Sequence, residues 1–230
     1  MIGALARPPL ARLARRPRAW IAIGAWGALA LAFAIAARQQ RAAHGADHVL
    51  VDTYGALVLP LLAYLIVGAT LGSQSLRASI APVVGFGAPP VRAAAAAIGI
   101  AAALCAAIGG VLGAAVALVA HGISDPPLWR DAIVSLYAGG LGGIAYAAWF
   151  SLGAAFGRRG MGRTGLLVVD WILGVTSGAG AAATPRGNLR NLLGGVPPME
   201  LSQRASAFAL IGIAVVCVSG ALLAVRRGPR

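Results

Sequence analysis

Long apolar runs, separated by short polar or Gly/Pro-rich stretches, dominate the hydropathy pattern of this chain. A helix needs about 20 apolar residues to cross the hydrocarbon core of a bilayer. Runs of about this length or longer occupy residues 19–37, 54–72, 91–120, 132–156, 164–183 and 206–225. The period-two alternation of an outer-membrane barrel strand is missing. The pattern therefore predicts an all-α fold, a polytopic membrane helix bundle with six transmembrane helices.

The pattern also divides the chain into one membrane domain with two basic ends. Residues 1–18 form a basic N-terminal segment, residues 19–226 the transmembrane domain, and residues 227–230 a basic tail. Within the first segment, residues 10–18 combine leucines with arginines. This composition suits a short interfacial helix on the inner leaflet or a disordered basic tail that only sets topology. We expect the short N-terminal interfacial helix.

Composition supports a membrane protein. Only 11% of the residues are charged, against roughly 25% in soluble domains, so the chain lacks the polar groups that would coat a water-soluble surface. The 19 basic residues are all arginines, and with 6 acidic residues they give a net charge of +13. Nucleic acid is not expected as a partner, because no soluble recognition fold accompanies this charge. We attribute it to the lipid bilayer, whose anionic inner leaflet attracts basic groups.

The arginines also predict the orientation. If the N-terminus is cytoplasmic, the outer loops carry only Arg38, Arg41, Arg130, Arg186, Arg190 and Arg204, and the other arginines lie inside. Cytoplasmic loops are the ones enriched in arginine, so this arrangement is favoured. It places every acidic residue except Asp170 in an outer loop. We therefore expect a multi-pass protein of the bacterial inner membrane with both termini in the cytoplasm.

The longest expected inner loop covers residues 73–92. One or two helical turns followed by a Gly/Pro break would form a small cytoplasmic knob. Leu76, Ile80 and Val83 fall on one face of such a helix, and Phe86 lies in the break. Apolar side chains on a cytoplasmic loop need cover, so we expect either a partner protein or the membrane surface to bury them.

The outer segment 184–205 contains a second short amphipathic stretch. Its leucines at 189, 192 and 193 suit a short helix that lies on the outer leaflet. Glycines spaced four residues apart recur in the spans, at 109 and 113, 139 and 143, and 174 and 178. This spacing lets helix backbones approach closely, and it indicates tight packing within the bundle.

Asp170 is the one acidic residue inside an expected span. A carboxylate at membrane depth faces protein or water, and such residues often mark a substrate or proton site. A proton relay normally has further ionisable groups nearby, and the spans offer few polar side chains. We therefore favour a structural anchor, hydrogen-bonded to a neighbouring helix or paired with Arg158, Arg159 or Arg163.

Candidates for catalysis, metal binding or cofactor binding are weak. His44, His48 and His121 lie in outer loops and could assemble a zinc site, although solvated loops explain them better. Cys105 and Cys217 lie in apolar runs as small buried side chains. We expect no catalytic residue, no metal and no cofactor, and the chain is not expected to be an enzyme.

The order of these parts resembles the membrane subunit (permease) of an ABC transporter of the type-2 exporter class. The resemblance covers residues 10–226. It rests on the basic segment Leu13-Ala14-Arg15-Arg16-Pro17-Arg18-Ala19-Trp20, six spans, a cytoplasmic knob between spans two and three, and an outer element at 185–198 between spans five and six. This chain departs from many such permeases in being short, with small outer loops.

The resemblance implies an ATP-driven exporter. The chain would form the translocation path with a second permease copy and couple to a separate ABC-type ATPase, because it has no Gly-x-x-x-x-Gly-Lys-[Ser/Thr] motif of its own. The knob at 75–92 would dock on that ATPase through Leu76, Arg77, Ile80, Val83 and Phe86. Two other classes stay open, a membrane scaffold or accessory subunit and an ion-coupled secondary transporter. The second would use polar groups in the spans, mainly Tyr64, Tyr137, Tyr146, Ser177 and Asp170.

Overall fold

The computed structural model describes residues 2–40, 45–72, 74–122, 127–156 and 161–227, and every regular element in these ranges is a helix. The all-α prediction is confirmed for this part of the chain. In chain order the elements are α1 Ile2–Ala14, α2 Pro17–Gln39, α3 Gly45–His48, η1 Val49–Val58, α4 Leu59–Leu71, α5 Leu76–Gly85, α6 Pro90–Ala120, α7 Leu128–Ala155, α8 Met161–Gly174, α9 Ala179–Ala182, α10 Pro185–Leu192, η3 Pro198–Glu200 and α11 Gln203–Arg226. Element η1 is a π-helix and η3 a 3₁₀-helix.

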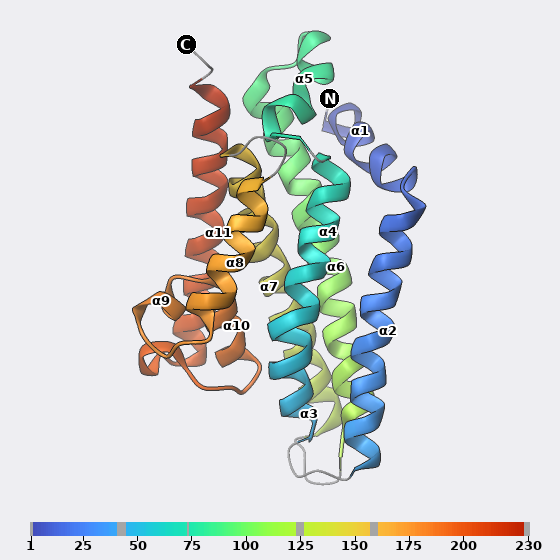
Figure 1. Cartoon of the computed structure of the whole chain (residues 1–230), viewed down its shortest axis with the longest axis vertical. Coiled ribbons are helices and arrows are strands. Elements are labelled where there is room, and N and C mark those ends of the chain that lie inside the picture. Colours follow the sequence, from blue (N-terminus) through green and yellow to red (C-terminus); the bar gives the residue numbers. More distant parts are fainter. Residues whose placement is uncertain (1, 41–44, 73, 123–126, 157–160, 228–230) are drawn as a thin grey trace.

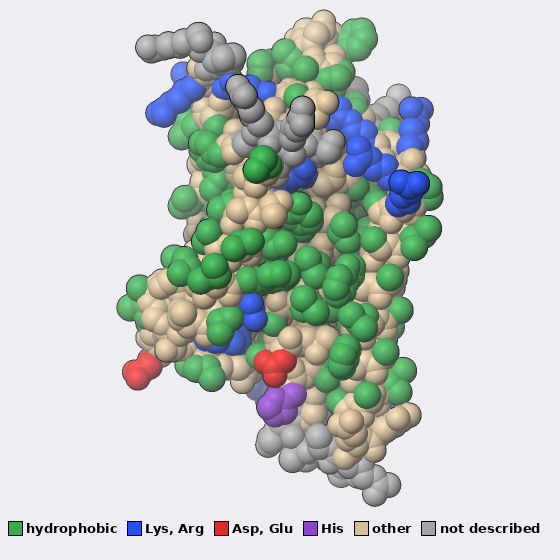
Figure 2. All heavy atoms as spheres, in the orientation of Figure 1, with side chains coloured by type: hydrophobic (Ala, Val, Ile, Leu, Met, Phe, Trp, Pro, Cys, Tyr) green, Lys and Arg blue, Asp and Glu red, His purple; other side chains and the backbone are tan. Residues whose placement is uncertain are grey.

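The long helices run along one axis and form a bundle (Figure 1). Among the described residues, five stretches are long and apolar enough to cross a membrane: the helices Pro17–Gln39, Pro90–Ala120, Leu128–Ala155 and Gln203–Arg226, and the region Gly45–Gly85, which comprises α3, η1, α4 and α5. Figure 2 shows apolar side chains spread over the middle of the visible surface. A surface of this kind is stable against lipid and costly in water, so the chain is a membrane protein.

The two ends of the bundle differ. The N- and C-termini, α1 and α5 lie at one end, and α3 lies at the other (Figure 1). On the face shown in Figure 2, most arginines gather at the end that holds the termini, whereas the acidic residues and a histidine lie in the opposite half. Helix α1 covers Ile2–Ala14 and thus begins and ends earlier than the expected interfacial helix at 10–18.

Helices α6 and α7 pack directly on each other through glycines. A Cβ atom built on Gly109 of α6 would lie 2.9 Å from the carbonyl oxygen of Gly139 on α7, and one on Gly113 would lie 2.8 Å from that of Ser135. No side chain fits between backbones this close. The tight packing predicted from the 109/113 and 139/143 spacings is confirmed. In the third pair only Gly174 is tightly packed: a Cβ added there would lie 2.6 Å from the Cβ of Arg186, whereas one on Gly178 would meet nothing within 4 Å.

The second expected span, 54–72, begins earlier than its hydropathy indicated, because helical structure already starts at Gly45. Ten residues of it, Val49–Val58, form a π-helix, and Pro60 follows in the first turn of α4. Proline has no N–H to donate and crowds the preceding turn of an α-helix. The wider π turns directly before Pro60 accommodate it within a continuous helical run. The hydropathy pattern did not reveal the π-helix.

The fifth expected span, 164–183, is not one continuous helix. Helix α8 ends at Gly174 after 14 residues, and the chain then turns through α9 into α10. At about 1.5 Å per residue, α8 is too short to cross a bilayer alone. Hydropathy missed the break because residues 174–183 consist mainly of glycine and alanine, which score as apolar but allow the chain to turn.

Candidate functional site

Two places in the described chain carry the expected functional residues. The first is α5, at the end of the bundle that holds both termini (Figure 1). Ser75 caps its N-terminus by accepting a hydrogen bond from the backbone N–H of Ala78 at 3.4 Å. The helix ends at Gly85, and Gly87 follows with a φ of +88°, a conformation that suits glycine. The predicted helix and break in 73–92 are therefore present.

The apolar face expected to dock on an ATPase points into the protein instead. Leu76 and Ile80 are buried in the hydrophobic core of this chain, and Val83 is half-buried against the same core. The expectation that a partner or the membrane surface would cover these side chains is wrong, because the chain covers them itself. Leu76 and Ile80 are thus fold-determining residues, and charging them would test stability.

Arg77 is also turned toward its own chain. Its Nη2 donates to the backbone carbonyl oxygens of Ala224 and, at 3.3 Å, Val225 near the end of α11. A second arginine bonds α5 from another helix: Nη2 of Arg12 in α1 donates to the carbonyl oxygen of Ser79 at 2.6 Å. Two arginines therefore bond α5 to α1 and α11. A force applied to α5 would reach both of these helices.

Phe86 is the expected docking residue that remains available. Its side chain is 94% exposed, directly after the end of α5. Ala78, Ala81 and Pro82 of the same helix are exposed as well. Together these four residues form an exposed apolar surface, which we call the α5 surface. It is small, and Phe86 is its one large side chain.

The second place is the surroundings of Asp170 in α8. The side chain is fully buried. Its Oδ2 accepts a hydrogen bond from the Tyr146 hydroxyl of α7 at 2.9 Å, and its Oδ1 accepts one from the backbone N–H of Arg186 at 3.0 Å. Arg186 lies in the first turn of α10, where backbone N–H groups have no partner within the helix. Asp170 thus joins α7, α8 and α10, and we call these three residues the Asp170 network.

Arg163, one of the arginines expected as a partner of Asp170, bonds another part of the chain. Arg163 instead donates from Nη2 to the carbonyl oxygen of Gly72 at 2.9 Å. Arg158 and Arg159 lie outside the described residues. Both oxygens of Asp170 are bonded, and its side chain is fully buried. This closed geometry favours the structural anchor over a substrate or proton site.

Polar side chains also bond further backbone groups in the α8–α10 turn and in the segment that follows it. Nδ2 of Asn188 donates to the carbonyl oxygens of Ala182 and Thr184 at 2.8 and 2.9 Å. Nδ2 of Asn191 donates to the carbonyl oxygen of Leu201 at 2.7 Å and to the hydroxyl of Ser206 at 2.9 Å. In a membrane these bonds matter because no water replaces them.

Helix α10 confirms the short helix predicted in 184–205, but not its expected position on the outer leaflet. Leu189, Leu192 and Leu193 are buried in the core of the protein. Leu189 and Leu193 pack over Gly55 of the π-helix, where an added Cβ would lie 2.7 Å from a methyl group of Leu193. The apolar face of α10 is therefore an internal packing surface.

The histidines do not assemble a metal site in the described chain. His48 and Asp52 lie 3.6 Å apart with both side chains largely exposed, and His44 falls outside the described residues. No group of three or more His, Cys, Asp or Glu residues is arranged to hold a metal ion within the ranges that the structure describes. Cys105 and Cys217 are buried and unbridged.

The contacts that Tyr146, Arg163 and Arg186 make were not predicted from the sequence. Each is a polar residue in or beside an apolar run, which is a general signal of an intramembrane contact but does not identify the partner. Their partners lie 16 to 91 residues away in the chain.

Comparisons with protein-family models, characterised proteins and solved structures find no match to this chain. The proposed function therefore rests on the geometry of the chain itself.

Proposed function

We propose that this chain is the permease subunit of an ATP-driven exporter, working with a second permease copy and a separate ABC-type ATPase. The proposal puts the end that carries both termini and α5 in the cytoplasm of a bacterium, with the protein in the inner membrane. The arginine distribution supports this orientation. The order of elements supports the exporter class, since α5 lies between two membrane helices and α8–α10 form a turned-back element before α11.

The observation that carries the proposal is the construction of α5. An ATPase outside the membrane drives a permease only if a contact outside the membrane moves helices inside it. Leu76 and Ile80 fix α5 in the core, and Arg12 and Arg77 bond it to α1 and α11. The same element exposes Phe86 to the surroundings. Such a firmly held element with an exposed aromatic residue suits a coupling contact, because Phe is a frequent anchor in interfaces.

The test begins with the tagged chain purified in mild detergent from its own host. An ABC-type ATPase, identified by its Gly-x-x-x-x-Gly-Lys-[Ser/Thr] motif, is expected to co-purify with the chain and to hydrolyse ATP faster in the complex. Phe86→Asp should reduce the recovered ATPase at least about tenfold, the loss of one interface anchor worth about 1.4 kcal/mol or more. Its folded fraction should stay unchanged, because Phe86 is exposed.

Val196→Asp is the matched control. Val196 is also an exposed apolar residue, 63% against 94% for Phe86, but it lies between α10 and η3 in the other half of the molecule. This variant should retain the ATPase. If folded wild-type chain recovers no ABC-type ATPase, or if Phe86→Asp and Val196→Asp retain it equally, the coupling assignment is wrong. The scaffold class would then explain the chain better.

A further inference from the structure

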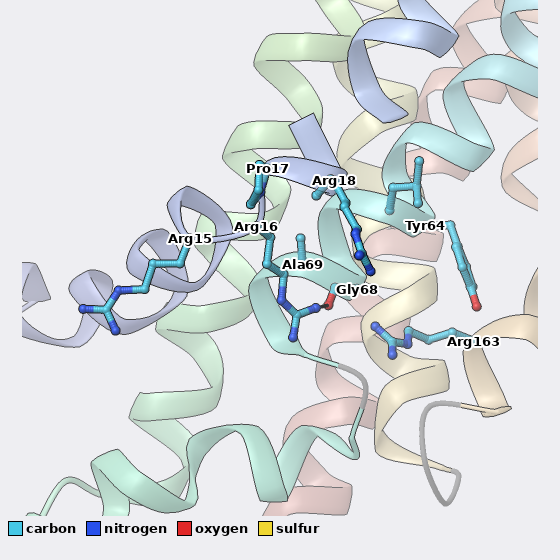
Figure 3. Close-up of a pocket in the computed structure, with 10 residues that line it drawn as sticks. Arg15, Arg16, Pro17, Arg18, Tyr64, Gly68, Ala69 and Arg163 are labelled. Carbon is cyan, nitrogen blue, oxygen red and sulfur yellow. Dashed lines mark hydrogen bonds between the residues drawn. The ribbon is translucent and has the colours of Figure 1, made fainter. Parts of the chain in front are cut away.

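A basic cavity of about 570 Å³ opens beside the junction of α1 and α2. Arg15, Arg16, Arg18 and Arg163 line it, together with Tyr64 and small or apolar residues. Figure 3 shows the side chains of Arg16, Arg18 and Arg163 directed toward a common space, whereas that of Arg15 points away from it. These side chains come from the α1–α2 junction, α2 and α8, so the fold itself brings them together.

Arg163 is the most informative member of this cluster. Only 4% of it is exposed, yet within the described chain its Nε and Nη1 are buried without a hydrogen-bond partner. Its Nη2 uses the carbonyl oxygen of Gly72, and its Cζ lies 6.0 Å from the ring centre of Tyr64. A buried guanidinium with unused donors is unfavourable unless something accepts them. The unused donors of Arg163 therefore call for an acceptor in the cavity.

The charge balance identifies the kind of acceptor. None of the residues that line the cavity is acidic, so no carboxylate from the lining balances the converging guanidinium groups. Within the described ranges, Arg16 donates to a backbone carbonyl oxygen, that of Gly68, at 3.3 Å. Like charges held close together repel, and an anion bound among them removes this repulsion. Guanidinium groups match the oxygens of a phosphate especially well, because each offers several donors in a plane.

The backbone of α2 also favours an anion in this cavity. Helix α2 begins at Pro17, which lines the cavity and has no N–H, and the N–H of Ala19 donates to the carbonyl oxygen of Arg16 at 2.9 Å, so the backbone acts on the cavity through the helix dipole. The positive end of the helix dipole of α2 therefore lies at the cavity and favours an anion there. A Cβ added to Gly68 would come within 3.3 Å of Nη1 of Arg163, so glycine at this position leaves room for the guanidinium.

The position favours a lipid as the source of the phosphate. Leu65, Ala69 and Ala19 line the cavity beside the arginines, so an apolar surface adjoins the basic one. Trp20 and Ile21, the next residues of α2, are exposed large apolar side chains. Tryptophan is enriched where lipid headgroups meet the hydrocarbon core. A soluble anion would have no use for the apolar wall, whereas the acyl chains of a lipid would lie against it.

We propose that this cavity binds the phosphate headgroup of an anionic phospholipid. Arg18 and Arg163 hold the phosphate oxygens, Arg16 adds a third positive charge, and the apolar wall receives the start of the acyl chains. The proposal does not depend on export or on an ATPase. It requires only that the end of the bundle carrying α1 meets a lipid headgroup region.

The test uses the purified, delipidated full-length chain and phosphatidylglycerol or phosphatidylcholine with short acyl chains, with binding followed by native mass spectrometry. Phosphatidylglycerol should bind at least about tenfold more tightly than phosphatidylcholine. Arg18→Gln and Arg163→Gln should each weaken phosphatidylglycerol binding at least about tenfold. Arg92→Gln is the matched control, because it removes the same charge from an exposed residue that does not line the cavity, and its affinity should stay within about twofold of wild type.

Arg18 keeps the test decisive if Arg163→Gln fails to fold, because the Arg18 side chain is exposed and its loss leaves the core intact. Equal losses in Arg92→Gln and Arg18→Gln would overturn the proposal, since the binding would then reflect net charge alone. Inorganic phosphate is the second probe. If it stabilises the chain against heat at millimolar concentration while the two lipids bind equally, the site takes soluble phosphate and the lipid assignment is wrong.

Discussion

The α6–α7 contact and the α8–α10 region solve the same problem in opposite ways. Both bring backbone segments together inside an apolar bundle. Between α6 and α7 the side chains are removed, so that Gly109 meets Gly139 backbone to backbone. In α8–α10 the helix is interrupted, and polar side chains such as Asp170 and Asn188 bond the backbone groups that the interruption leaves open.

The two regions differ in the kind of interaction that stabilises each of them. Two continuous helices satisfy their own backbone hydrogen bonds, so their contact depends mainly on shape, and the Tyr54 hydroxyl adds one bond beside it, to the carbonyl oxygen of Gly109 at 2.5 Å. An interrupted helix has unpaired N–H and C=O groups, each of which needs a specific partner at a specific distance. The α6–α7 contact should therefore be sensitive to added volume, and the α8–α10 region to removed hydrogen bonds.

Adding one methyl group to the α6–α7 contact should have the largest effect. A Cβ at position 143 would lie 3.0 Å from the backbone nitrogen of Ala106 and still closer to the carbonyl group of Cys105. Backbone atoms cannot turn aside, so Gly143→Ala should lower the free energy of unfolding by about 2 kcal/mol or more. The measurement is thermal unfolding of the purified protein in one detergent, together with its yield of folded protein.

Gly140→Ala provides the control on the same helix. A Cβ there would meet the carbonyl oxygen of Ala106 at 3.6 Å, an ordinary contact. Alanine also stabilises a helix relative to glycine by up to about 1 kcal/mol, so the melting temperature of this variant should equal or exceed that of the wild type. Equal melting of the two variants would mean that backbone contact does not hold α6 against α7.

Removing the acceptor of the Asp170 network should have the next largest effect. Asp170→Leu leaves the Tyr146 hydroxyl and the Arg186 N–H buried without an acceptor, which we expect to cost about 2 kcal/mol. Asp170→Asn keeps an oxygen for the Arg186 N–H and should lose about half as much. Protease resistance and thermal unfolding in nanodiscs measure both. Equal behaviour of the two variants would contradict the anchor role, and loss of export with normal stability in Asp170→Asn would favour ion coupling.

Removing a single donor should have the smallest effect. Tyr146→Phe deletes the hydroxyl bonded to Asp170 but keeps the ring, which stacks on Phe150 with centroids 5.8 Å apart. A loss of about 1 kcal/mol is expected in the same thermal assay. Tyr137→Phe on the same helix is the control, because Tyr137 is exposed and its hydroxyl loss should leave the melting temperature unchanged. A Tyr146→Phe variant as stable as Tyr137→Phe would show that the network is not held by this bond.

The sequence determined which of the long apolar segments are helical and which positions on α6 and α7 are small enough for close packing. Apolar runs at 91–120 and 132–156 became α6 and α7 with ends shifted by a few residues, because burial of a long apolar run in lipid needs no partner from elsewhere in the chain. The glycine spacing on each helix was likewise visible in the chain. Both features are local, and so the residues themselves carry the information.

The tertiary structure alone decided which side chains are available and which polar groups meet. Leu76 and Ile80 are buried within the chain while Phe86 is exposed, although all three fitted one expected surface. Asp170 reaches α7 and α10, and Arg163 reaches a cavity built partly from the α1–α2 junction. Helical periodicity assigns a residue to a face of its helix, but it does not say what that face meets. The contacts between segments distant in the chain follow from how the helices pack, which no single segment encodes.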